Sequence, residues 1–244
     1  MFEARKQFPV MGLPVHLEDD YDRWLGNRLH EKVGSHVVTL NAEMVMQAES
    51  NQALADAIQL AELVIPDGAG VIFYLLLHGK RQQRCPGIEL AESLLQQAAA
   101  LGKSYPVFFY GGKPGVAEEA ATAWQQKLPN LAIAGIKDGY LSPEAENELK
   151  VTLKTQEPSL ILVGLGVPRQ ELWIAENRYL SPQSTWIGVG GSFDIWAGIK
   201  TRAPGWLRDN NLEWLYRLYQ EPWRWRRMMA LPQFALKAIS HRLA

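Results

Sequence analysis

The 244-residue sequence lacks the features that mark several large protein classes. Its single cysteine, Cys85, cannot form a disulfide bond within the chain, which fits a reducing compartment. Proline, glycine or charge interrupts every apolar run well short of the roughly 18 residues that a spanning helix needs. Residues 1–14 also lack the apolar run of a signal peptide, so we expect neither a leader nor a spanning helix. The formal net charge of −1 argues against a nucleic-acid-binding protein.

Metal-binding patterns are also absent. The five histidines are scattered without ligand spacing, and one cysteine cannot complete a thiolate site. The segment Asp20-Tyr21-Asp22 matches the short acidic pattern of metal-dependent glycosyltransferases, but an amphipathic helix pattern with Leu25 and Leu29 follows it directly. We therefore interpret these acids as a helix cap. We expect no metal and no cofactor.

What the sequence does contain is an alternation of short apolar segments with longer helical patterns. Nearly continuous apolar segments suit strands that are buried on both faces of a parallel sheet. The alternation predicts an α/β fold with a doubly wound, mainly parallel, Rossmann-like sheet. The expected strands are His36–Leu40, Leu63–Pro66, Pro106–Tyr110, Leu131–Ile136, Leu160–Val163 and Thr185–Val189. The expected helices are Glu43–Ser50, Ala69–Leu77, Ile88–Leu101, Gly115–Lys127, Pro143–Thr155 and Pro168–Leu180.

Charge and tryptophan are concentrated at the end of the chain. Residues 208–244 hold seven Lys or Arg against three Asp or Glu, and four tryptophans lie between positions 206 and 225. We predict an α/β catalytic domain over 1–207 and a basic, aromatic helical appendage over 208–244. Such a composition suits association with a membrane surface, although a helical subdomain packed on the core would also explain it. The same surface could pair two copies of the chain in solution.

Polar or glycine-rich residues follow every predicted strand, at the edge where open α/β sheets bind ligands. Asp67 follows the second predicted strand and precedes a glycine. It is either a turn residue or a carboxylate that acts as a general base. One such base is enough for an inverting sugar transfer, because the sugar nucleotide already carries a good leaving group.

Two glycine turns are candidates for phosphate binding. Gly111, Gly112 and Lys113 join a strand to a helix, where backbone N–H groups either bind phosphate or simply form a turn. The spacing is not that of a Walker P-loop. Gly164 and Gly166 form a second such turn, which lacks the third glycine of a dinucleotide fingerprint. The side-chain amide of Gln170, in the following helical turn, faces either a ligand or solvent.

Three arginines near the end of the chain share a spacing that could place them on one helical face. Arg217, Arg224 and Arg227 follow one another at steps of seven and three, provided that Pro222 merely begins a new helix. The planar guanidinium group suits phosphate oxygens, so these arginines are candidates for binding a diphosphate. The alternative is that their charges are simply solvated.

In this order, the motifs resemble the WecG/TagA/CpsF family, also called glycosyltransferase family 26. The resemblance covers about residues 8–230, and the ordered set is specific although each motif alone is weak. Ala42 stands where many relatives have proline, and residues 84–89 differ from the common pattern, which leaves the sugar open. The matching segments are Thr39–Glu43, Val64–Gly68, Gly111–Gly115, Val163–Glu171, Gly190–Asp194, Arg202–Pro204 and Glu213–Arg217.

The resemblance implies a metal-independent, inverting transferase that moves a hexose, often N-acetylmannosamine, from a UDP-sugar to a polyprenyl-diphosphate-linked sugar. This reaction belongs to surface or extracellular polysaccharide synthesis, on the cytoplasmic face of the cell membrane. By motif position Asp67 would be the base, and the three tail arginines would bind the diphosphate. The sugar and acceptor pocket would be lined by Thr39, Asn41, Arg84 and Gln170.

Two other functions stay open at this point. One is a nicotinamide-dependent sugar-nucleotide oxidoreductase, against which the missing glycine fingerprint after the first strand counts. The other is a membrane-associated module that binds a sugar nucleotide without catalysis.

Overall fold

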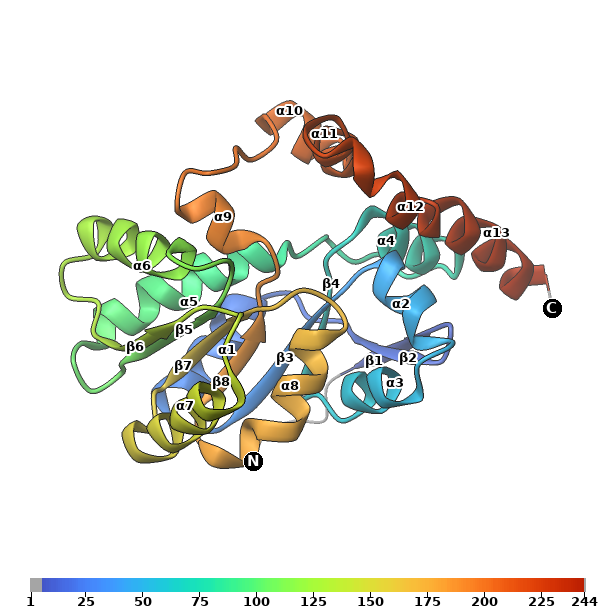
Figure 1. Cartoon of the computed structure of the whole chain (residues 1–244). Coiled ribbons are helices and arrows are strands. Elements are labelled where there is room, and N and C mark those ends of the chain that lie inside the picture. Colours follow the sequence, from blue (N-terminus) through green and yellow to red (C-terminus); the bar gives the residue numbers. More distant parts are fainter. Residues whose placement is uncertain (1–5, 244) are drawn as a thin grey trace.

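A six-stranded parallel sheet forms the centre of the molecule, for which a computed structural model describes residues 6–243 (Figure 1). Its strands are β3 (Ser35–Leu40), β4 (Leu63–Pro66), β5 (Val107–Gly111), β6 (Ile133–Lys137), β7 (Leu160–Gly164) and β8 (Thr185–Gly188). They pair in the order β4-β3-β8-β7-β5-β6, and every pairing is parallel. All six predicted strands are therefore present, and the predicted α/β fold is confirmed.

Both faces of the sheet are covered, which explains why its strands read as continuous apolar runs. In β7, Leu160 and Leu162 pack into one core cluster, whereas Ile161 and Val163 pack into a cluster on the opposite face. Successive side chains of a strand point to opposite faces, so every position is apolar when both faces are buried.

Helices cover each face of the sheet. The first face packs against α1 (Tyr21–His30), α5 (Gly87–Leu101), α6 (Val116–Lys127) and α9 (Ser192–Trp196). The opposite face packs against α2 (Ala42–Ala48), α3 (Gln52–Gln59), α4 (Ala69–Leu77), α7 (Pro143–Gln156) and α8 (Arg169–Asn177), and η1 (Arg178–Leu180) follows α8. The Asp20 carboxylate accepts a hydrogen bond from the Arg23 backbone N–H at 2.8 Å. This contact confirms the interpretation of Asp20-Tyr21-Asp22 as the cap of α1.

Three features were not predicted from the sequence. One is a β-hairpin, β1 (Gln7–Val10) and β2 (Leu13–His16), and the others are the helices α3 and α9. The hairpin lies beside β4, where the Val64 backbone N–H donates to the His16 ring at 2.9 Å. The hairpin thus covers the edge of the parallel sheet, a role that becomes visible only in the folded chain.

The C-terminal segment arches over the carboxyl edge of the sheet (Figure 1). It consists of α10 (Gly205–Asp209), α11 (Glu213–Gln220), η2 (Pro222–Arg224), α12 (Trp225–Met228) and α13 (Ala230–Leu243). The predicted helical appendage is therefore present, although α10 runs across the expected boundary at 207/208. Phe234 and Ala238 of α13 are buried against α2 and α4, which ties the far end of the segment to the core.

The C-terminal segment leaves large aromatic side chains exposed. Tyr219 is 82% exposed and Trp223 is 70% exposed, and Trp206 and Trp225 are also exposed. None of the helices described between residues 6 and 243 has both the length and the apolar composition needed to cross a bilayer.

Candidate active site

Two adjoining cavities lie between the carboxyl edge of the sheet and the C-terminal segment. The first extends over the turns that follow β3, β7 and β8, and the second lies between α2, α4 and α11–α12. Residues from both halves of the chain form the boundary that the two cavities share. This boundary consists of Asn41, Glu43, Asp67, Glu213, Arg217, Arg224 and Arg227.

Asp67 lies at the end of β4, on this shared boundary. Its backbone N–H donates to the Leu40 carbonyl at 2.9 Å, which aligns the ends of two neighbouring strands. The surrounding protein desolvates the carboxylate and raises its pKa from 3.8 to about 7, although Arg217, Arg84 and the Gly87 backbone N–H oppose the shift. A carboxylate with this pKa is suited to accept a proton near neutral pH.

The other carboxylates that line the first cavity are held by arginines. Each of the three accepts a short, charge-assisted hydrogen bond from a guanidinium group and so already has a cationic partner. The pairs are Arg227–Glu43 at 2.6 Å, Arg217–Glu213 at 2.8 Å and Arg224–Glu221 at 2.6 Å. The burial of Asp67, by contrast, favours proton uptake by its carboxylate.

Thr39 and Asn41 lie beside Asp67, at the end of β3. Asn41 caps α2 by accepting the Met44 backbone N–H at 3.0 Å, so its side-chain nitrogen is the group that it can offer to a ligand. Thr39 packs against Gly87, where an added Cβ would lie 2.6 Å from the Thr39 methyl carbon. Only glycine lets the start of α5 approach this closely. Both predicted pocket residues line the first cavity, and Arg84 lines the second.

Gln170 connects two glycine turns. Its side-chain oxygen accepts the backbone N–H groups of Gly166 and Gly190, each at 3.1 Å, and its nitrogen donates to Glu171 at 3.0 Å. The side chain is 2% exposed, so it is not the solvated amide that the sequence left open. Gln170 borders the first cavity chiefly by fixing the turns that follow β7 and β8.

The glycine turns occupy different positions relative to the cavities. Gly166 lines the first cavity, whereas Gly164 packs against Phe193 and leaves no room for a Cβ. Gly111, Gly112 and the exposed Lys113 line neither cavity. Their turn instead supports the end of β7, because the Gly112 N–H donates to the Gly164 carbonyl at 2.9 Å.

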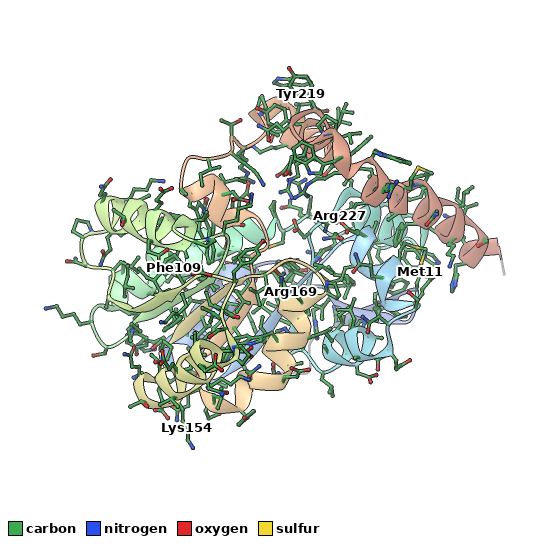
Figure 2. All side chains as sticks on the ribbon, in the orientation of Figure 1. Met11, Phe109, Lys154, Arg169, Tyr219 and Arg227 are labelled. Carbon is green, nitrogen blue, oxygen red and sulfur yellow. The ribbon has the colours of Figure 1, made fainter. Side chains whose placement is uncertain are left out.

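The three tail arginines do not share one helical face, because Arg217 lies on α11, Arg224 on η2 and Arg227 on α12. α11 ends at Gln220 and Pro222 begins η2, and all three arginines nevertheless line both cavities. Figure 2 shows Arg227 pointing from the C-terminal segment toward the core, whereas Tyr219 points away from it. The segment therefore presents cations to the cavities and Tyr219 to its outer surface.

Sequence reasoning missed the polar residues that complete the site. Glu213 and Glu43 hold arginines, and Ser192, Lys200 and Arg202 also line the first cavity. The sequence did carry one signal, since Glu213 precedes Arg217 by four residues, the spacing of a helical ion pair. Within residues 6–243, no three His, Cys, Asp or Glu side chains gather in a group that could hold a metal ion.

Comparison with known proteins agrees with the motifs. The family model described as "Glycosyl transferase WecG/TagA/CpsF family" matches residues 8–244. An N-acetylglucosaminyldiphosphoundecaprenol N-acetyl-beta-D-mannosaminyltransferase of Bacillus spizizenii is 36% identical over 230 residues, which cover 94% of this chain and 85% of the relative. A protein of the same name from Bacillus subtilis is 34% identical over 212 residues, which cover 86% and 81% of the two chains.

Proposed function

The chain belongs to the WecG/TagA/CpsF family and is a glycosyltransferase, and from this premise we propose its substrates and its catalytic base. The donor is UDP-N-acetylmannosamine, and the acceptor is N-acetylglucosamine linked to a polyprenyl diphosphate. The names of both Bacillus relatives support this pair of sugars and a β-linked product. Membership of a transferase family favours this reaction over a nicotinamide-dependent oxidoreductase and over a non-catalytic module.

Asp67 is the general base of the proposed reaction. It takes the proton from the acceptor hydroxyl while that oxygen bonds to the anomeric carbon of the donor. The bond from the anomeric carbon to the diphosphate breaks on the opposite face, and UDP leaves with the electron pair. The observation that carries this assignment is the position of Asp67 where the two cavities meet, so that its carboxylate can face a donor in one and an acceptor in the other.

The donor occupies the first cavity, over the glycine turns. There Thr39 and Asn41 can contact the sugar, and the turns that Gln170 holds can contact its phosphates through backbone N–H groups other than those of Gly166 and Gly190, which donate to Gln170 itself. The acceptor occupies the second cavity, beside Arg84 and the apolar residues of α4 and α13. Arg217, Arg224 and Arg227 line both cavities, so their guanidinium groups can stabilise diphosphate charge in either.

The composition of the C-terminal segment supports a position of the site at a membrane surface. The tryptophans of the segment at positions 206, 223 and 225 are exposed, and Tyr219 points away from the core on the same segment that carries the cavity arginines (Figure 2). Aromatic and basic residues in this arrangement suit the boundary between lipid headgroups and acyl chains. A lipid-linked acceptor could then reach the second cavity without leaving the bilayer, which supports a peripheral location at the inner face of the cell membrane.

The test is acceptor-dependent release of UDP by the wild type and by Asp67→Asn. The asparagine keeps the shape of the side chain but cannot take up the proton, so turnover should fall by roughly two to four orders of magnitude while UDP binding is retained. A short polyprenyl-diphosphate-linked N-acetylglucosamine serves as acceptor with a panel of UDP-sugars, and calorimetry measures UDP binding.

Asp138→Asn is the matched control for this experiment. Asp138 also precedes a glycine after a strand at the same edge of the sheet, but it lines neither cavity. This variant should turn over like the wild type. Retained turnover in Asp67→Asn would remove Asp67 from the mechanism, and UDP binding without release from any donor would indicate a binding module.

A further inference from the structure

Glu213 is a buried carboxylate that joins the C-terminal segment to the core. It is the first residue of α11 and is 8% exposed. One of its oxygens accepts from Arg217 at 2.8 Å, and the other accepts from Arg84 at 3.4 Å. Arg84 belongs to the loop before α5, so one carboxylate bridges two arginines that lie far apart in the sequence.

The bridge lies next to Asp67. Asp67, Arg84, Glu213 and Arg217 all line the second cavity, and both arginines and Glu213 act electrostatically on Asp67. Burial alone would raise the pKa of Glu213, but the guanidinium groups of Arg217, Arg202 and Arg84 lower it below its usual range. Glu213 is therefore a fixed negative charge that is shared between two cations.

We propose that Glu213 is a positioning residue, which holds the guanidinium groups of Arg84 and Arg217 beside Asp67 and prevents them from pairing with it. The inference rests on the proposed role of Asp67 as the base, but it assigns a function to a different residue. It also gives the C-terminal segment a part in the chemistry, beyond covering the cavities.

The physical argument is a competition between two carboxylates for the same two cations. An arginine that pairs directly with Asp67 would stabilise the ionised carboxylate and make it a poorer base. Because Glu213 accepts hydrogen bonds from both guanidinium groups, it partly neutralises them and also repels negative charge on Asp67. Glu213 therefore keeps Asp67 basic while both arginines remain close enough to contact a diphosphate.

Other charged or titratable groups lie near Asp67 and the two arginines that Glu213 bridges. Arg202 acts on Glu213 from the segment before α10, and the Cys85 thiol, whose pKa is raised by burial and by nearby carboxylates, lies beside Asp67. None of these groups accepts a hydrogen bond from either bridged arginine in the described structure. The remaining charged residues on the boundary are Glu43, Arg224 and Arg227, of which Glu43 and Arg227 pair with each other and Arg224 pairs with Glu221.

The experiment measures kcat, KM and their pH dependence for Glu213→Gln in the full-length chain. In the wild type, the acidic limb of kcat/KM should report a base with a pKa near 7. In Glu213→Gln this limb should move to lower pH by roughly one unit, the effect of one charge a few ångströms away. At pH 8 kcat should fall by roughly tenfold to a hundredfold, while KM for the acceptor should change little, because the arginines exchange one carboxylate partner for another.

Glu89→Gln is the matched control. The Glu89 carboxylate also bridges two arginines between the core and the C-terminal segment, Arg202 at 2.5 Å and Arg208 at 3.4 Å, but it lines neither cavity. Its loss should leave the acidic limb at its wild-type position. A second variant, Glu213→Asp, keeps the charge but shortens the side chain. It should keep the acidic limb near the wild-type position and still lose kcat, because it reaches only one arginine.

Each outcome supports or overturns the proposal. An acidic limb that does not move in a folded Glu213→Gln, with Asp67→Asn inactive, would refute the positioning role and leave the proposed base intact. Full turnover in Asp67→Asn would instead remove the proposed base. If the thermal unfolding of both Glu213 variants shows that neither folds, Glu213 is a structural residue and the proposal is wrong.

Discussion

Asp67 should destabilise the folded protein at neutral pH, and Asp67→Asn should relieve that effect. Burial raises the pKa of the carboxyl group from 3.8 to about 7, so the folded state binds a proton more tightly than the unfolded chain does. Between these two values the folded state carries more protons, and its stability therefore falls as the pH rises. An asparagine has no proton to lose, so the variant should not show this decrease.

The size of the effect follows from the two pKa values. A shift of about three units corresponds to roughly 4 kcal/mol, since each unit is worth about 1.4 kcal/mol. The penalty should be absent near pH 4, grow between pH 4 and 7, and stay constant above pH 7. For a chain of this size, roughly 4 kcal/mol raises the melting temperature by on the order of 10 °C.

Urea unfolding of both proteins between pH 4 and 8 measures this difference. The stability of the variant relative to the wild type should increase with pH and level off near pH 7. At each pH, the difference between the free energies of unfolding of the two proteins removes the contribution of every other titrating group. Asp56→Asn, a surface change on α3, controls for the loss of one negative charge. A difference that stays flat across the range would refute the reasoning that Asp67 is desolvated.

Two further predictions concern other parts of the chain. Burial raises the pKa of Glu171 from 4.5 to about 7, so Glu171→Gln should be more stable than the wild type by roughly 3 kcal/mol at pH 8 and no more stable at pH 4, as measured by urea unfolding. An equal gain at both pH values would contradict this. Trp223→Ala combined with Tyr219→Ala should sediment less with anionic vesicles than Tyr179→Ala, which removes an equally exposed aromatic side chain outside the C-terminal segment. Equal sedimentation would place the membrane-binding surface elsewhere.

The tail variants are better probes than a deletion because of how α13 packs. Phe234 is 1% exposed and lies between α2 and α4, where Gly70 leaves room for its ring. Removing the segment would expose this apolar surface and create a new site for aggregation or lipid contact. Changing only side chains on the outer surface leaves that packing intact.

The sheet could be predicted from the sequence because its signal is local. Each strand is buried on both faces, so apolar runs such as Leu160–Val163 reveal it without knowledge of any partner. The same logic places Asp67 and Asn41 at one edge, because parallel strands end together there. The hairpin at residues 7–16 escaped prediction because it depends on covering the edge of β4, a contact with a distant part of the sequence.

The site could be predicted only in part, because several of its residues work through partners far away in the chain. Gln170 was expected to contact substrate, but its oxygen holds two glycine turns that are 24 residues apart. Gly112 was a candidate for phosphate binding, with an ordinary turn as the alternative, and in the structure its N–H donates to the Gly164 carbonyl of the neighbouring turn. Glu213 was quoted only as part of a matching segment and was given no role, since its importance comes from Arg84 in the core.

The pairing of arginine with glutamate along the cavities has a consequence for binding. A substrate diphosphate has to compete with the glutamates for Arg217, Arg224 and Arg227, so part of the energy of each new contact is offset by the contact that is lost. In return, the guanidinium groups are already fixed in place, and less side-chain entropy is lost when the diphosphate binds. A single phosphate is less able to replace several glutamates at once than a diphosphate, which spans more than one arginine. The glutamates should therefore favour diphosphates over monophosphates, a selectivity that unpaired arginines on the same helices would not provide.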